Sequence, residues 1–353
     1  MSDSLFAAFP DRSKQEWLDK VEKDLRGKAL ESLNWQVRED WTISPFAHSE
    51  DWTEKVPPIV SSGKTTNSWE IGERIVVKEA KVANEIALSA LENGVNALLL
   101  ILPNTFSTED FEMLLKGIEL EWISVHFDAT SDANLPSFLS FLTQSACDFS
   151  KLKGSWRTEE TTLAFYEALP NFKFYQVKGV PYYQNTKNTI QELTQITRAL
   201  HEQLQQIEAY QIQQVHLSIA VGESYFISIA KIRALKLLWQ NLLSAYGLAI
   251  DLPLHIEAHL APASFTDDQH QNMAKAATQA LSAVIGGVDR LFIAPADGRE
   301  NPFTKRIARN IQHLLQLESH LDHVLDPAAG SYYIEQLTQE IGVRVWEQFK
   351  LDG

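Results

Sequence analysis

The sequence predicts an α/β protein, namely a (β/α)8 TIM barrel with an extended N-terminal arm. Two observations support this fold class. Eight short apolar runs alternate with helical patterns from about residue 69 onward, which is typical of parallel strands joined by right-handed crossovers. No glycine occurs in the turn after the first run, where residues 79–84 read Glu-Ala-Lys-Val-Ala-Asn. An open dinucleotide-binding sheet would need a glycine-rich turn there, so the closed barrel is favoured.

The first 68 residues are predicted to form the arm. Ser13 and Glu16 have the spacing of a capping box, and the helix that follows carries apolar residues at helical spacing and can end at Gly27. The next stretch has aromatic residues but little regular period, so we expect it to lie on another surface. The pattern does not decide between the chain's own barrel and a partner chain. The apolar helix positions are Trp17, Leu18, Val21 and Leu25.

The barrel is predicted over residues 69–353, with strands and helices in alternation. Strands are expected at 74–78, 97–102, 122–127, 151–154, 172–177, 215–220, 252–258 and 290–294. Helices are expected at 79–93, 109–116, 136–145, 159–168, 190–209, 225–245 and 271–285. Eight strand units match a closed barrel.

Composition excludes several classes of protein. The chain has 353 residues and a formal charge of −15, which argues against a general nucleic-acid binder because such proteins need a basic face. Its single cysteine, Cys147, excludes an internal disulfide framework and makes a cysteine-rich zinc site unfavourable. The N-terminus lacks a signal-peptide pattern, and the longest apolar run, 95–103, is too short to cross a bilayer. A cytoplasmic protein is expected, without nucleic-acid or membrane partners.

Polar residues follow the predicted strands, where barrel enzymes place their chemistry. They form a hypothesis only, since every barrel has such residues: Lys78, Asn104, His126, Asp128, Ser155, Lys178, Glu223, His259 and Asp297. His255, Glu257 and His259 alternate along one strand and so face the same way. Two imidazoles and a carboxylate could bind zinc or non-haem iron. No further ligand stands out by spacing, so a metal-dependent enzyme is the minor alternative and no metal site is predicted.

Three runs of the chain resemble the methylmalonyl-CoA mutase family, and its small-subunit branch in particular. They are Phe9-Pro10, Trp17, Leu25, Leu33-Asn34-Trp35 and Ile43-Ser44-Pro45; then Tyr225-Phe226, Ile229-Ala230-Lys231, Arg233 and Leu238-Trp239; and finally 306–310, Glu318-Ser319, 326–332, Glu335 and Leu337-Thr338. The resemblance implies a barrel whose bore holds the coenzyme A tail. It also implies adenosylcobalamin-dependent radical interconversion of methylmalonyl-CoA and succinyl-CoA, in which the cofactor carries the radical chemistry.

The chain departs from the catalytic pattern of that family. Catalytic members carry Ser-Gly-Tyr-His after the fifth strand, where this chain has Lys178-Gly179-Val180-Pro181. Val180 has no hydroxyl and Pro181 no proton donor. The run 258–261 keeps His259 but loses the glutamine of Ala-His-Cys-Gln. The cobalamin-binding domain with its Asp-x-His-x-x-Gly loop is not found, since Met273 stands at the glycine position of the one similar run, 268–273.

The resemblance therefore implies a small subunit without catalytic residues or a cofactor of its own, paired as a heterodimer with a catalytic large subunit. Candidates at the barrel mouth are His126, Tyr182, His259 and Asp297. Candidates for the partner interface are Phe9, Trp17, Trp35, Trp41 and Trp52, because aromatic anchors dominate interfaces. Acyl-CoA binding stays open, although the aliphatic run 97–102 predicts a bore packed with large side chains. The alternative is a catalytic acyl-CoA isomerase that uses a cobalamin domain in trans.

Overall fold

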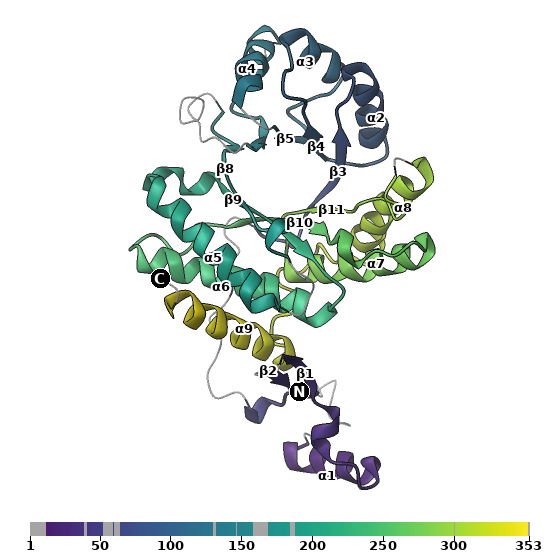
Figure 1. The fold of residues 1–353 in the computed structure, drawn as a ribbon, viewed down its shortest axis with the longest axis vertical. Coiled ribbons are helices and arrows are strands. Elements are labelled where there is room, and N and C mark those ends of the chain that lie inside the picture. Colours follow the sequence, from purple (N-terminus) through teal and green to yellow (C-terminus); the bar gives the residue numbers. More distant parts are fainter. Residues whose placement is uncertain are drawn as a thin grey trace, which may run out of the picture.

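Nine parallel strands form one sheet that closes on itself (Figure 1). The computed structural model describes residues 12–38, 41–51, 59, 64–129, 132–145, 147–157, 169–183, 188–299 and 301–351. The strand order is β7-β6-β5-β4-β3-β11-β10-β9-β8. Its two ends, β7 (Phe172–Lys173) and β8 (Tyr175–Lys178), are separated only by Phe174, so the nine strands occupy eight positions of a barrel. The predicted (β/α)8 barrel is confirmed.

Each of the eight predicted strands is present, with shifted bounds. The first begins earlier than expected, at Glu70, and the fourth begins and ends later, reaching Arg157. Both contain charged residues that weaken an apolar pattern. Besides β7 and β8, the sheet consists of β3 (Glu70–Val76), β4 (Ala97–Ile101), β5 (Ser124–Asp128), β6 (Lys153–Arg157), β9 (Val215–Val221), β10 (His255–Leu260) and β11 (Arg290–Phe292).

Helices surround the barrel (Figure 1). They are α2 (Ala80–Glu92), α3 (Thr108–Leu114), α4 (Leu135–Gln144), α5 (Thr189–Gln206), α6 (Tyr225–Ala245), α7 (Gln269–Gly286), α8 (Pro302–His313) and α9 (Tyr332–Leu351). The pattern analysis did not predict α8 or α9, and the helix predicted at 159–168 lies outside the described residues. Within the described part of the chain, no helix combines the length and the apolar character needed to span a membrane.

The two faces of the barrel sheet differ in chemistry. Leu98, Leu100 and Phe127 face the helices and belong to the hydrophobic core. The inward positions that alternate with them are polar and buried, as His126 and Ser155 show. The expectation of a bore packed with large aliphatic side chains is therefore wrong: alternation along β4 turns its leucines outward, with the exception of Leu99.

The N-terminal segment packs on the barrel through one hairpin. Helix α1 (Lys14–Leu25) begins with the predicted capping box of Ser13 and Glu16 and is followed by left-handed Arg26 and Gly27. Strands β1 (Trp35–Arg38) and β2 (Trp41–Ile43) pair antiparallel. Trp41 is 2 % exposed, and its indole Nε1 donates a 2.9 Å hydrogen bond to Glu340 on α9. This side chain anchors the hairpin to the chain's own barrel.

Replacing Trp41 by alanine is expected to lower the free energy of unfolding by about 3–5 kcal/mol, because a large buried aromatic side chain leaves a cavity. Urea unfolding followed by circular dichroism measures the change. Trp35→Ala, on the neighbouring strand and 43 % exposed, is the matched control and should cost less than about 1 kcal/mol. Equal losses for the two variants would show that Trp41 is not the anchor.

Candidate functional site

The barrel bore is divided into two chambers. The upper chamber, at the carboxyl ends of the strands, has a volume of about 400 Å³, and the lower chamber, at their amino ends, of about 560 Å³. The upper chamber is lined by residues that include Arg74, Leu99, Asp128, Arg157, Gln176, Lys178, Val180, Pro181, Ser218, His259 and Phe292. The lower chamber is lined by residues that include Lys64, Glu70, Lys153, Ser155, Lys173, His216, His255, Glu257, Asp289 and Arg290.

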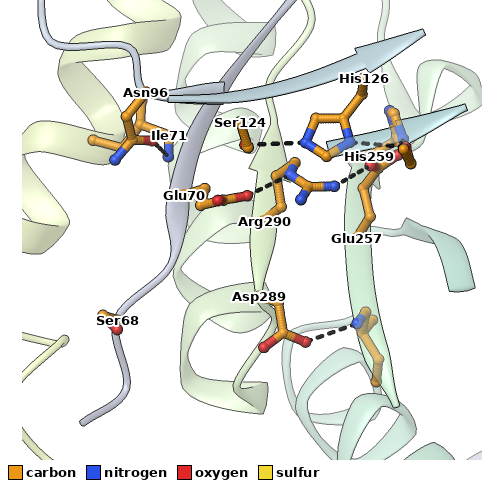
Figure 2. Close-up of polar contacts among 12 residues, drawn as sticks. Ser68, Glu70, Ile71, Asn96, Ser124, His126, Glu257, His259, Asp289 and Arg290 are labelled. Carbon is orange, nitrogen blue, oxygen red and sulfur yellow. Dashed lines mark hydrogen bonds and ion pairs between the residues drawn. The ribbon is translucent and has the colours of Figure 1, made fainter. Parts of the chain in front are cut away.

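A buried ion-pair layer centred on Glu257 separates the chambers. Its carboxylate accepts from Arg157 and from Arg290 Nη1, the latter at 3.0 Å, and from His259 Nε2 at 2.5 Å. Arg290 also donates from Nε to Glu70 at 2.7 Å (Figure 2). Burial opposes ionisation of Glu257, but Arg157 and His259 outweigh it and hold the pKa of this carboxyl well below its usual range. The layer is thus a charged partition across the bore.

An aromatic contact between Phe292 and His259 lies just above that partition. The ring of Phe292 stacks on His259 with centroids 5.1 Å apart and planes at 15°. On the neighbouring strand β3, Gly72 is paired with Phe292, and a Cβ at Gly72 would overlap the phenyl ring, so only glycine leaves room for it there. Both Gly72 and Phe292 line the upper chamber. The phenyl ring therefore fills space that a ligand threaded along the barrel axis would need.

His126 lies inside the bore and not at its mouth, which corrects the sequence-based expectation. Its ring is fully buried between Ser155 Oγ at 2.8 Å and Ser124 Oγ at 3.0 Å. Figure 2 shows the contact with Ser124. Burial, reinforced by Arg290 and Arg157, lowers the pKa of His126 well below its ordinary value. A neutral imidazole held by two hydroxyls is a structural polar contact.

The other three mouth candidates have different surroundings. His259 lines the upper chamber together with Val180 and Pro181. Tyr182 is at the end of the short 3-10 helix over Val180–Tyr182, half-buried beside that chamber. Asp297 accepts hydrogen bonds from Thr304 Oγ1 at 2.8 Å and from the Arg299 N–H at 3.1 Å. It therefore organises the loop before α8 and does not line the chamber.

The arginines that shape the bore are not among the residues predicted from the sequence. Arg157 and Arg290 reach Glu257, and Arg309 of α8, which also lines the upper chamber, donates to Glu73 at 2.7 Å. Along β6, Lys153, Ser155 and Arg157 alternate with Gly154 and Trp156, so the three polar residues share one face of the strand. One face of every strand in a closed barrel points into the bore, so this alternation was the available signal in the sequence.

The metal hypothesis is wrong for the described residues. His255, Glu257 and His259 do share one face of β10, but the two histidines are four residues apart along the strand, roughly 13 Å. His255 lines the lower chamber and His259 the upper one, while Glu257 is occupied by two guanidinium groups. Across the described ranges, His, Cys, Asp and Glu side chains form no group of three able to hold a metal ion.

The aromatic interface candidates are distributed unevenly. Trp17 stacks on Phe46 with centroids 4.0 Å apart and is half-buried, whereas Trp35 is 43 % exposed. Trp41 belongs to the chain's own core and offers no free anchor, which corrects that candidate. Phe9 and Trp52 lie outside the described residues.

Comparison with known proteins identifies the family. Residues 167–351 match the family model of methylmalonyl-CoA mutase. The chain belongs to the methylmalonyl-CoA mutase family. It is 31 % identical to the methylmalonyl-CoA mutase small subunit of Porphyromonas gingivalis and 28 % identical to that of Streptomyces virginiae, each over 98 % of this chain.

This chain spans 64 % of the length of those two small subunits. Among solved structures, dihydropteroate synthase from Xanthomonas albilineans matches 71 % of this chain and 93 % of its own, with 11 % identity and a TM-score of 0.41. The assignment of the barrel rests on the strand pairing described above.

Two of the runs that resemble the mutase family meet in one buried cluster between α6 and α9. The Arg233 guanidinium, on a side chain only 2 % exposed, donates to Asp326 at 3.0 and 2.9 Å and to Glu335 at 2.8 Å. It also donates to Thr338 Oγ1 at 3.3 Å. Asp326 adopts a left-handed backbone, φ 46°. These residues hold the last helix against the barrel, away from both chambers.

Proposed function

We propose that this chain acts as the non-catalytic small subunit of a methylmalonyl-CoA mutase and supports a catalytic large subunit. The observation that carries the proposal is the bore. An acyl-CoA that enters the barrel at the amino ends of its strands could bring its thioester into the upper chamber only by passing the Glu257 layer and Phe292. At the position of the family's tyrosine and histidine, Val180 and Pro181 line that chamber, and neither can donate or accept a proton through its side chain.

The described residues do not fit adenosylcobalamin, the cofactor that the family implies. When bound to a catalytic partner, that cofactor would supply the radical chemistry. In this chain the run that begins like a cobalamin loop has another use. Asp268 is the N-cap of α7 and accepts from the backbone N–H groups of His270 and Gln271. His270 belongs to the first turn of that helix, so it is not presented on a loop.

The proposed interface includes residues 1–68 as an arm on the large subunit. None of the described residues of α1 is buried, and its apolar positions Trp17, Leu18, Val21 and Leu25 are only half-buried. An amphipathic helix normally buries such a stripe. In Figure 1 α1 extends away from the barrel. The half-buried apolar stripe of α1 therefore supports the proposal that a partner chain covers this face of the helix.

Association with the large subunit tests the interface. Leu18→Asp is expected to weaken co-purification with a catalytic mutase chain at least tenfold, because it places a charge in the half-buried stripe. Lys23→Gln, on the opposite face of α1, is the control and should leave association unchanged. If Leu18→Asp associates as well as the unaltered chain, the arm does not form the interface.

Turnover tests the non-catalytic role separately. Pro181→Ala in the assembled complex is expected to leave the isomerisation rate within about twofold, whereas loss of a positioned acid or base typically costs 10²–10⁴-fold, as an order of magnitude. The rate of succinyl-CoA conversion measures this. Turnover by this chain with a separate cobalamin domain, in the absence of a large subunit, would establish the catalytic alternative in its place.

A further inference from the structure

The lower chamber has more positive than negative groups available to a ligand. Its three carboxylates already have partners within the protein. Asp289 pairs with Lys64 at 2.5 Å and accepts from the Ile256 N–H at 2.7 Å, and Glu70 pairs with Arg290 at 2.7 Å. Glu257 is shared by Arg157 and Arg290, as described above. The acidic groups are therefore neutralised before any ligand enters.

Two lysines of the lower chamber lack such a partner. Lys153 is exposed at the chamber's rim on β6, and Lys173 is half-buried on β7. Neither forms an ion pair with any residue in the described ranges. Within those ranges, Lys173 Nζ donates only to the neutral carbonyl of Gln213, at 2.5 Å, and burial lowers the pKa of this lysine to about 8. An anion between the two lysines would restore the balance of charge.

His216 adds an unsatisfied donor to the same chamber. Its side chain is 2 % exposed, and neither ring nitrogen has a hydrogen-bond partner among the residues that the structure describes. On the adjacent strand His255 stands in register with it and lines the same chamber. Burial, together with Arg157, lowers the pKa of His216 well below its usual value, so the ring is neutral and offers one N–H and one acceptor. Buried polar groups of this kind normally have a partner.

We propose that the lower chamber binds a small oxyanion of the phosphate class, with Lys153 and Lys173 supplying charge and His216 a hydrogen-bond donor. A hydrogen phosphate ion carries acceptor oxygens for these donors and an O–H for the acceptor nitrogen of the imidazole. The Glu257 layer closes the chamber above, so a ligand enters from the amino ends of the strands. This inference is independent of the proposed function, because it concerns the end of the bore that does not hold Val180 and Pro181.

Isothermal titration of the full chain with inorganic phosphate at low ionic strength tests the proposal. We expect saturable one-site binding that weakens with added salt and becomes at least tenfold weaker in Lys173→Met and in His216→Phe. Lys178→Met, which removes a lysine from the upper chamber, is the control and should leave the affinity within twofold. Absence of saturable binding by 10 mM, as an order-of-magnitude ceiling for a specific site, would overturn the proposal.

Two further measurements distinguish the source of the phosphate and exclude misfolding. Titration with glycerol phosphate separates a free ion from a monoester, and either result supports the chamber. Binding of coenzyme A without binding of either small phosphate would overturn it. Thermal unfolding without ligand shows whether each variant is folded. If Lys173→Met and His216→Phe are both folded and both bind phosphate with unchanged affinity, the assignment to this chamber is contradicted.

Discussion

Replacing Glu257 by glutamine is expected to lower the free energy of unfolding by about 3–5 kcal/mol, as removal of one partner of a buried ion pair typically does. Arg157, whose side chain is 3 % exposed, loses its ion pair with Glu257, and Arg290 keeps its pair with Glu70. The Arg157 guanidinium then lies buried beside Arg290 without the negative charge of Glu257. Guanidinium chloride or urea unfolding, extrapolated to water, measures the loss.

Glu70→Gln is the matched control, since it changes another carboxylate on the same Arg290. The Glu70 side chain is 33 % exposed, so its loss should cost about 1 kcal/mol or less. A comparable loss for the two variants would mean that the charge of Glu257 has no special role in the partition.

The Glu257 layer also predicts the direction of the pH dependence. The folded pKa of Glu257 lies well below the value of an unfolded glutamate, so the folded state binds fewer protons in acid. Its stabilising contribution is complete above about pH 4.3, the unfolded value, and is lost as the pH falls towards the folded pKa. The slope of stability against pH below pH 4 should therefore be smaller in Glu257→Gln than in the unaltered chain.

Arg233→Met is expected to cost a similar amount, about 3–5 kcal/mol, because it leaves Asp326 and Glu335 without their cation. Their carboxylates are only 19 % and 9 % exposed, so solvent cannot replace the guanidinium. The same substitution at Arg12, which pairs with Glu16 at 70 % and 52 % exposure, is the control and should cost at most about 1 kcal/mol. Denaturant unfolding compares them.

Loss of the Arg233 cluster should act first on the last helix. We expect proteolysis of Arg233→Met to begin within α9 before the barrel is cleaved, since the cluster joins α9 to α6. Cleavage that begins instead in the barrel strands would show that this cluster does not hold α9 in place.

Much of the barrel could be predicted from the sequence because its strands are outwardly apolar. Leu217, Ile219 and Ile256 belong to the core beneath the helices, and this periodic burial is visible in the chain. The order of strands followed from their alternation with helices. Helices α8 and α9 were missed because the runs there were interpreted as family motifs, although Asn301, Pro302 and Phe303 contain a cap and a proline start.

The interior of the barrel could not be predicted in the same way. The run 97–102 is apolar at every position, so its alternation carries no information on which face is inward. In β6, Arg157 lies beyond the predicted end of the strand. A charged residue usually indicates exposure to solvent, so the apolar pattern did not extend the strand to it. Only closure of the sheet shows that Arg157 faces Glu257 from a strand 100 residues away in sequence. Val180 and Pro181 follow β8 after Gly179 and line the upper chamber.

The division of the barrel into an apolar outer face and a polar bore has a consequence for its temperature dependence. Exposure of apolar surface raises the heat capacity on unfolding, while exposure of polar surface lowers it. A bore lined by His126, His216, Glu257 and the arginines subtracts from the increment that the leucines of the outer face contribute. Desolvation of charged groups also becomes less costly on heating. The stability curve of this barrel is therefore flatter than that of a barrel of equal size filled with aliphatic side chains.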